Sequence, residues 1–392
     1  MIDVEANRHV QAKCSWEQHR NCPSNPFRVK SRTSPDPPMA VPLPDSSQFL
    51  VPEWAEQCAV LIAWPYAEGD FRPWLPAVED TYGAIGAEIA SRETLIIACQ
   101  NEGHRHLIAS QLAARGVDPR RLRYVVVPYD DVWVRDTAPL TVATPEGLRF
   151  LDFGFNGWGG KYPHAADALL AQNLHRAGIF GEIPLDRVDF ILEGGSVESD
   201  GAGTVMTTSR CLLNPNRNPA LRRDEIEARL RTSFGVEQIL WLDHGHAAGD
   251  DTDAHIDTLA RFCSPDTIAH TACDRPDDDL YGDFQGMAEQ LSSFTSTSGR
   301  PYRLVPLPVP RPIVSEEGER LPATYANFLI INGAVLVPVY DDPADDVALG
   351  RLVTCFPGRE IVPIPCLPLI RQYGSLHCMT MQFPKNPRSS PS

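Results

Sequence analysis

The sequence predicts an α/β protein built from a repeated unit in which strands surround a single helix. From about residue 54 onward, short apolar runs typical of buried strands alternate with segments that carry helical spacing. The same order of strands around one helix recurs about five times along the chain. The units share too little identity to prove a repeat, but their rhythm indicates a pseudo-symmetric array that closes on itself.

The individual elements follow from the spacing of apolar residues. Continuous apolar runs such as 59–65 and 94–99 are typical of buried strands, and apolar positions at 77–91 recur with helical spacing. Strands are predicted at 59–65, 94–99, 123–128, 138–144, 148–153, 188–192, 204–208, 238–242, 257–263, 267–270, 303–306, 327–331, 334–338, 360–364 and 375–382. Helices are predicted at 77–91, 104–114, 165–177, 221–234, 281–296 and 345–355.

The composition changes near residue 48. Residues 1–48 are polar, rich in Pro, Ser, Asn and Arg, and interrupted by prolines, which predicts a disordered N-terminal extension. Met39 is a candidate start of the native chain. The rhythmic part predicts one domain over 49–385, followed by a short tail at 386–392.

Composition and charge limit the classes of partner. The chain of 392 residues has 35 basic and 51 acidic residues, a net charge of −16 that repels nucleic acid and anionic lipid and attracts small cations. No apolar run reaches the ~18 residues of a membrane span, and the N-terminus lacks the apolar core of a signal peptide. The ten cysteines include no CxxC pair, which indicates reduced thiols in a cytoplasmic protein. The sequence does not decide whether the protein forms a homo-oligomer.

One thiol near the C-terminus is a candidate nucleophile. Residues 374–382 alternate like a strand after Gly374, which would present Cys378 at a strand end. The alternative is a buried structural cysteine, the commoner role of a free thiol. Strand alternation places His377 on the opposite face from Cys378, so its proton partner is expected from elsewhere in the chain.

Polar clusters at other predicted strand ends could supply that partner. The first segment, 131–139, contains Trp133, Arg135 and Asp136. The second, 191–196, contains Glu193 before Gly194 and Gly195. The third, 250–257, contains Asp250, Asp251, Asp253, His255 and Asp257. Each has a structural alternative: an ion pair or capped turn in the first, a hairpin with a surface glutamate in the second.

The third cluster places an imidazole beside a carboxylate. If residues 255–262 form a strand, its two-residue period puts His255 and Asp257 on one face. Such a cluster could instead bind Zn or Mn, but it lacks a recognised ligand spacing, so no metal is predicted. His255 is therefore the best candidate for the proton partner of Cys378.

Together these segments resemble the ordered signature of the agmatine deiminase family, which also includes the bacterial peptidyl-arginine deiminases. The resemblance runs from about Pro52 to Pro384 and is carried by residues 133–139, 193–196, 211–219, 253–257, 325–328 and 377–378. It implies the pentein fold, a five-bladed α/β propeller with pseudo-fivefold symmetry. It also implies hydrolysis of a guanidine to a ureido group with release of ammonia, most simply agmatine to N-carbamoylputrescine.

The chemistry of that reaction explains the residue types. A guanidinium carbon is a poor electrophile, so it needs a strong nucleophile and rigid positioning, and carboxylates bind its paired N–H groups in bidentate fashion. By the resemblance, Asp136 and Asp257 hold the guanidinium, Glu193 orients His255, and His255 transfers protons to and from the intermediate on Cys378. Trp133 and Asp251 are further candidate substrate contacts. No metal or organic cofactor is implied.

Several positions depart from the family pattern. Gln372 and Tyr373 replace glycines before the His-Cys pair, Ala254 replaces the glycine before the catalytic histidine, and Asp251 replaces a longer glutamate. The pocket that contacts the rest of the substrate is therefore expected to differ from that of the family. The substrate could instead be another guanidino compound or a peptidyl arginine. An amidinotransferase, a non-catalytic protein of the same fold and a metallohydrolase are the remaining alternatives.

Overall fold

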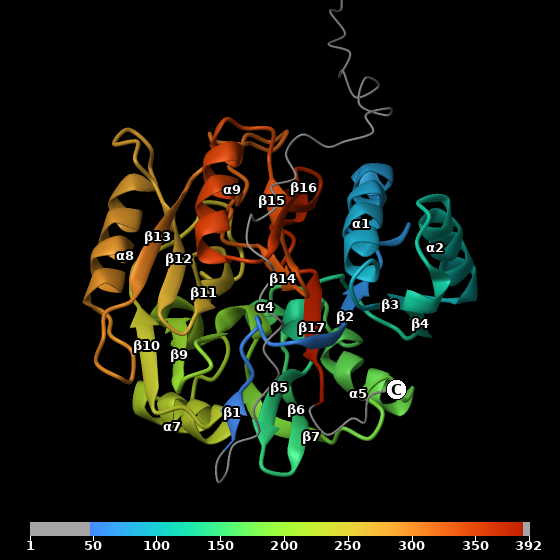
Figure 1. The fold of residues 1–392 in the computed structure, drawn as a ribbon, viewed down its shortest axis with the longest axis horizontal. Coiled ribbons are helices and arrows are strands. Elements are labelled where there is room, and N and C mark those ends of the chain that lie inside the picture. The colour runs from blue at the N-terminus through green and yellow to red at the C-terminus, as the bar shows by residue number, and fades with distance from the viewer. Residues whose placement is uncertain (1–47, 387–392) are drawn as a thin grey trace, which may run out of the picture.

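The computed structural model describes residues 48–386 and shows a mixed α/β fold (Figure 1). The strands are β1 (Phe49–Leu50), β2 (Gln57–Ala63), β3 (Thr94–Cys99), β4 (Leu122–Val126), β5 (Leu140–Thr144), β6 (Gly147–Gly154), β7 (Leu185–Ile191), β8 (Glu198–Ser199), β9 (Thr204–Thr208), β10 (Gln238–Leu242), β11 (Ala260–Ser264), β12 (Thr267–Ala272), β13 (Arg303–Pro308), β14 (Leu329–Ile331), β15 (Ala334–Val339), β16 (Glu360–Pro365) and β17 (Thr380–Pro384).

The helices comprise longer elements and single turns. The longer ones are α1 (Leu75–Ala90), α2 (Glu102–Ala114), α5 (Leu170–Arg176), α7 (Arg223–Phe234), α8 (Tyr281–Ser293) and α9 (Ala344–Cys355). The short turns are α3 (Val134–Thr137), α4 (Gly157–Gly160), α6 (Ser209–Leu212), η2 (Arg72–Trp74), η3 (Pro119–Arg121), η4 (Asp167–Leu169), η5 (Gly194–Ser196), η6 (Ile256–Thr258) and η7 (Leu369–Gln372). The predicted extension and tail lie outside the described residues, except for Gln48 and Asn386.

Within residues 48–386 the strands form five small sheets of similar topology. Their strand orders are β1-β5-β6-β7, β10-β9-β8, β11-β12-β13, β14-β15-β16 and β17-β2-β3-β4. Every sheet contains an antiparallel pair followed by a parallel pair, for example β11 with β12 and then β12 with β13. The recurring unit predicted from the sequence is therefore confirmed.

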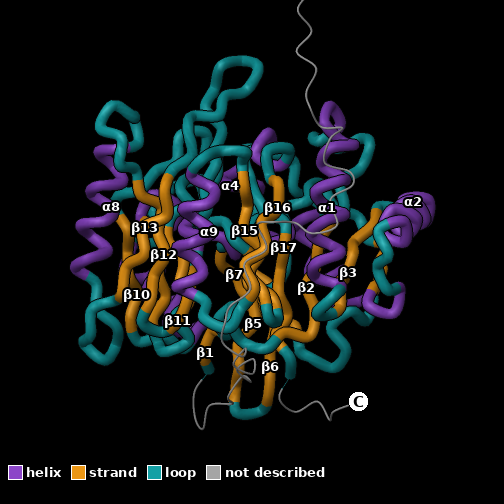
Figure 2. The backbone as a smooth tube through the Cα atoms, turned by 45° about the horizontal axis from the view of Figure 1, so that its top comes forward, coloured by secondary structure: helices purple, strands orange, loops and turns teal. Residues whose placement is uncertain are grey.

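One of the longer helices lies between the two strands of each parallel pair, because a parallel pair requires a long crossover. Helix α8, for example, lies between β12 and β13 and buries Phe284, Met287 and Leu291, which share one helical face. The helices α2 and α8 lie at opposite edges of the molecule in both ribbon and tube views, and β17 lies near its middle (Figures 1 and 2).

Most predicted elements are confirmed, and β3, β9 and β10 have the predicted bounds. Two predicted strands begin three or more residues late, at Ala260 instead of 257 and at Thr380 instead of 375. In both places a threonine closes a turn: Thr258 Oγ1 donates to the carbonyl oxygen of His255 at 2.9 Å, and Thr380 Oγ1 to that of His377 at 3.0 Å. Such local side-chain bonds compete with extended backbone, so both histidines precede tight turns.

Candidate active site

The five predicted catalytic residues all lie in irregular segments at the ends of strands. Asp136 is in α3, Glu193 follows β7, His255 and Asp257 flank the start of η6, and Cys378 is in the turn before β17. All five side chains are buried. A buried polar cluster of this kind costs free energy unless its members bind one another or a ligand.

Three of these residues meet at Gly195. Its backbone N–H donates to Asp136 Oδ1 at 2.9 Å. A Cβ atom at this position would lie 2.7 Å from His255 Nδ1, 2.9 Å from Asp136 Oδ1 and 3.2 Å from Asp257 Oδ2. The absence of a side chain at Gly195 therefore allows the imidazole and both carboxylates to converge.

We expect Gly195→Ala to inactivate the protein without unfolding it. The added methyl group would push apart His255, Asp136 and Asp257, and displacements of about 1 Å can cost ~100-fold in rate. Steady-state ammonia release and a thermal melt measure the two properties. The matched control is Gly350→Ala in α9, where a Cβ meets nothing within 4 Å and should stabilise the helix by ~0.5–1 kcal/mol. Full activity in Gly195→Ala would contradict the geometry.

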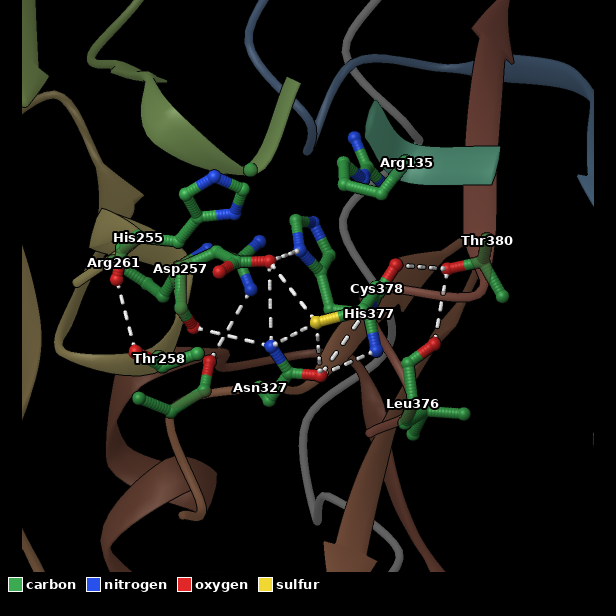
Figure 3. Close-up of polar contacts among 12 residues, drawn as sticks. Arg135, His255, Asp257, Thr258, Arg261, Asn327, Leu376, His377, Cys378 and Thr380 are labelled. Atoms are coloured by element: carbon green, nitrogen blue, oxygen red, sulfur yellow. Dashed lines mark hydrogen bonds and ion pairs between the residues drawn. The ribbon is translucent and has the colours of Figure 1, made fainter. Parts of the chain in front are cut away.

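Asn327 and Asp257 position the thiol of Cys378 (Figure 3). The sulfur lies 3.2 Å from Asn327 Nδ2 and 3.6 Å from Asp257 Oδ2. Asn327 Oδ1 accepts hydrogen bonds from the backbone N–H groups of His377 at 2.8 Å and Cys378 at 3.3 Å. Asn327 was not among the predicted site residues, although it lies in one of the segments that carry the family resemblance.

The predicted orientation of His377 is wrong. Because residues 376–379 form a turn rather than a strand, the two-residue alternation does not apply. The His377 ring does not point away from the site, since its Nδ1 lies 2.8 Å from Asp257 Oδ2, the same oxygen that Cys378 contacts. The strand argument for His255 and Asp257 also fails, yet the η6 turn brings the two side chains together.

The environment of His255 favours its charged form. His255 Nδ1 lies 3.7 Å from Asp136 Oδ1. Burial lowers the pKa of His255, but Asp136, Cys211 and Glu193 outweigh it and raise this pKa well above its usual value. A protonated imidazole next to the reacting centre can act as a general acid.

Glu193 contacts an arginine that the sequence analysis did not assign to the site. Both of its carboxylate oxygens accept from Arg217 Nε at 2.9 Å, and neither side chain is exposed. Glu193 lies close to His255 and Cys211, with potential ligand atoms within 4.8 Å of one another. Arg217 thus holds the carboxylate that flanks the imidazole. Arg217 lies in the segment 211–219, which carries the family resemblance, and this position could have identified it as a site residue.

Burial and charge raise the pKa values of Asp136 and Cys378. Burial, together with Asp257 and Glu193, raises the pKa of Asp136 to about 6, against the opposing effect of His255. Burial, followed by the charges of Asp257 and Asp136, raises the pKa of Cys378 well above its ordinary value. A thiolate therefore requires an additional positive charge in the site, which a cationic ligand would provide.

A pocket opens on Cys378 and Asp136. Its lining residues are Asp70, Asp131, Trp133, Asp136, Trp158, Tyr162, Asp251, Thr252, Gln372, Tyr373, Gly374 and Cys378. The predicted substrate contacts Trp133 and Asp251 both line it, whereas His255, Glu193 and Asp257 are not among its lining residues. A Cβ at Gly374 would lie 2.4 Å from the ring of Trp133, so this glycine permits the indole to pack at the pocket wall.

Two aromatic residues orient carboxylates of the pocket and were not predicted. Trp158 Nε1 donates to Asp136 Oδ2 at 3.0 Å, and the Tyr162 hydroxyl donates to Asp251 Oδ2 at 2.8 Å. Trp158 has a φ of 53°, a left-handed conformation that side chains rarely adopt. Such strain at a ligand-facing residue is typical of a functional site.

Positions where family glycines are expected adopt glycine-like backbone. Tyr373 has a φ of 63° and Ala254 a φ of 68°, both in the left-handed region. Each costs roughly 1–2 kcal/mol in a residue with a side chain. The chain therefore holds a left-handed backbone with a side chain at these two positions, and the side chain of Tyr373 lines the pocket.

Two groups of potential metal ligands lie within the described residues, Glu193 with Cys211 and His255, and Glu53 with Glu198 and His377. In both groups the carboxylates already accept from an arginine, Arg217 in the first and Arg261 in the second. These contacts satisfy the oxygens that a cation would need, so the donor sets do not fit a metal ion. No helix among residues 48–386 is long and apolar enough to cross a membrane.

Comparison with known proteins agrees with this geometry. The model of the Porphyromonas-type peptidyl-arginine deiminase family matches residues 49–384. The agmatine deiminase of Pseudomonas fluorescens is 33% identical over 365 residues, which cover 87% of this chain and 97% of that protein.

Solved structures of agmatine deiminases are also similar. A C. jejuni agmatine deiminase with substrate bound has a TM-score of 0.79 at 35% identity and covers 87% of this chain and 97% of its own. That of Enterococcus faecalis has a TM-score of 0.75 at 28% identity, with coverages of 88% and 100%. The chain therefore belongs to the family of Porphyromonas-type peptidyl-arginine deiminases, which the sequence resemblance had indicated.

Proposed function

We propose that the protein is a guanidine deiminase, a hydrolase of linear amidines that converts agmatine to N-carbamoylputrescine and ammonia. The observation that carries the proposal is a cysteine that lines an acidic pocket and whose sulfur lies 3.6 Å from the carboxylate of Asp257. The agmatine deiminases to which the chain is similar support the same reaction.

The substrate guanidinium would bind between Asp136 and Asp257. Carboxylates accept the paired N–H groups of a guanidinium, and its positive charge would lower the pKa of Cys378, which burial and the two carboxylates otherwise raise. Binding thus supplies the charge that creates the nucleophile. An empty site would keep its thiol protonated and protected from oxidation.

The thiolate of Cys378 would attack the guanidinium carbon and form a C–S bond. The C–N bond to one amino group then breaks, and that group leaves as ammonia with a proton from His255. The remaining thiouronium on Cys378 is attacked by water, which gives its proton to His255. Cleavage of the C–S bond releases the ureido product. Glu193, held by Arg217, is proposed to keep His255 oriented and charged.

The outer part of the pocket favours a second positive charge on the substrate. Asp70, Asp131 and Asp251 line it, and burial with the charges of Asp70 and Asp251 raises the pKa of Asp131 to about 7. Such a group of acids would be stabilised by an amine, which agmatine carries. A peptidyl arginine carries neutral amides at the same distance from its guanidinium, so it is the second candidate substrate.

We expect Asp251→Asn to raise the KM for agmatine by ~10-fold with a smaller change in kcat, because it removes one charge from the pocket wall. The assay measures ammonia release from agmatine, free arginine, a peptidyl arginine and a butylguanidine that lacks the amine. The KM for butylguanidine should not rise. Asp277→Asn, a substitution of an exposed aspartate, is the control. Preferred turnover of the peptide would overturn the assignment of agmatine, and transfer to an added amine without ammonia release would indicate an amidinotransferase.

For the architecture, we propose that the five sheets are the blades of a pentein α/β propeller, with the active site near its axis. The repeated topology of the sheets supports this arrangement. Residues 49–385 would form its single catalytic domain. The described cysteines are all free, which supports a cytoplasmic location.

A further inference from the structure

A buried chain of three titratable side chains lies behind the thiol. His377 Nδ1 is 2.8 Å from Asp257 Oδ2, and His377 Nε2 is 2.8 Å from Glu53 Oε1. The imidazole is 1% exposed and lies between Asp257 and Arg135 (Figure 3). His377 therefore bridges two carboxylates from segments that are far apart in the sequence.

The two contacts require two protons. A neutral imidazole has one N–H and one lone pair, and an ionised carboxylate has only lone pairs. If all three groups had a single proton between them, a nitrogen lone pair would face a carboxylate oxygen at 2.8 Å in a buried site. Either the imidazole is doubly protonated, or it is neutral and one carboxyl group is protonated.

The charged groups that surround His377 act in opposite directions. Burial and the guanidinium groups of Arg135 and Arg261 lower the pKa of His377 below its usual value, against the opposing effects of Glu53 and Asp257. Glu53 is held by Arg261 Nη2 at 2.6 Å and by Arg135 Nη1 at 3.0 Å. These contacts fix the outer carboxylate and favour its ionised form, so the ground for a second proton is the pair of 2.8 Å contacts that the His377 ring makes with two carboxylates.

We propose that Glu53, His377 and Asp257 form a triad that holds two protons and carries one negative charge instead of two, with His377 as a positioning residue for Asp257. The proposal rests on the proposed function. Cys378 and His377 share the same oxygen of Asp257, so the proton on His377 both orients that oxygen and reduces the negative charge next to the sulfur. A thiolate forms more easily beside the less negative triad.

Glu53 gives the triad access to solvent away from the substrate. It lies between β1 and β2, its side chain is 22% exposed, and it lines a second pocket with Gln57 and Arg135. This pocket shares no lining residue with the pocket at Cys378. The triad can consequently exchange protons with solvent while the substrate pocket is occupied.

The proton count can be measured by NMR without turnover. We would label histidine with ¹⁵N and the Asp and Glu carboxyl groups with ¹³C in the full chain, and assign the triad signals by comparison with His377→Gln and Glu53→Gln. At pH 7.5 we expect either a doubly protonated His377 ring, or a neutral ring with one protonated carboxyl group. A neutral ring with both carboxylates ionised would overturn the proposal. Because the experiment needs no substrate, its outcome is independent of the proposed function.

Two glutamine variants separate charge from structure. In His377→Gln the amide can donate to only one carboxylate, and the triad becomes more negative. In Glu53→Gln the amide can donate to a neutral His377, which keeps its N–H toward Asp257, and the triad retains one negative charge. The pH midpoint for alkylation of Cys378 should rise by about one pH unit in His377→Gln and shift less in Glu53→Gln. Equal midpoints in the two variants, with both folds verified by thermal melts, would contradict the proposal.

Discussion

Replacement of Cys378 by alanine is expected to reduce ammonia release from agmatine by at least about 10³-fold, the scale of losing a covalent nucleophile. The substitution removes the sulfur that lies 3.2 Å from Asn327 and 3.6 Å from Asp257, while the buried methyl group keeps the turn packed. Steady-state ammonia release measures the loss, and a thermal melt tests the fold.

The control for this experiment is Cys58→Ala. Cys58 is a free cysteine in β2, and partial burial of its sulfur with the charge of Glu93 raises its pKa to about 11, so it is a poor nucleophile. Its loss should leave turnover unchanged. Alkylation of Cys378, and the protection of that thiol by bound substrate, should also be unchanged. Retained ammonia production in Cys378→Ala would refute the covalent mechanism.

Substitution of His255 by alanine should lower kcat by ~100-fold or more, because the leaving ammonia loses its acid and the attacking water loses its base. His255 is 1% exposed and lies 3.7 Å from Asp136, so no solvent species can easily take its place. Intact-mass spectrometry after mixing with substrate shows which step fails. A covalent adduct on Cys378 indicates slow hydrolysis, and its absence indicates slow formation.

His106→Ala provides the histidine control, since this side chain is exposed on α2 and remote from the pocket. It should retain full activity. If His255→Ala also turned over normally, the assignment of the general acid would be wrong, and Asp136 or a water molecule would have to supply the proton.

Local sequence patterns predicted the elements because burial and hydrogen bonding within a strand or helix depend on neighbouring residues. The apolar runs at β3, β9 and β10 specified those strands to the residue, and their order around the helices indicated a unit repeated about five times. The turns at His255 and His377 were wrongly predicted as parts of strands. A threonine three residues after each histidine was the visible signal, but its hydroxyl could have pointed elsewhere.

The sequence by itself predicted the five residues proposed to carry out the chemistry: Cys378, His255, Glu193, Asp136 and Asp257 all lie together in the structure. Only the tertiary structure decided how they are held. Asn327 on the thiol, Trp158 on Asp136, Arg217 on Glu193 and Glu53 on His377 are contacts between distant segments. The physical reason is that periodicity describes one segment at a time, whereas hydrogen bonds between sheets depend on how the chain closes.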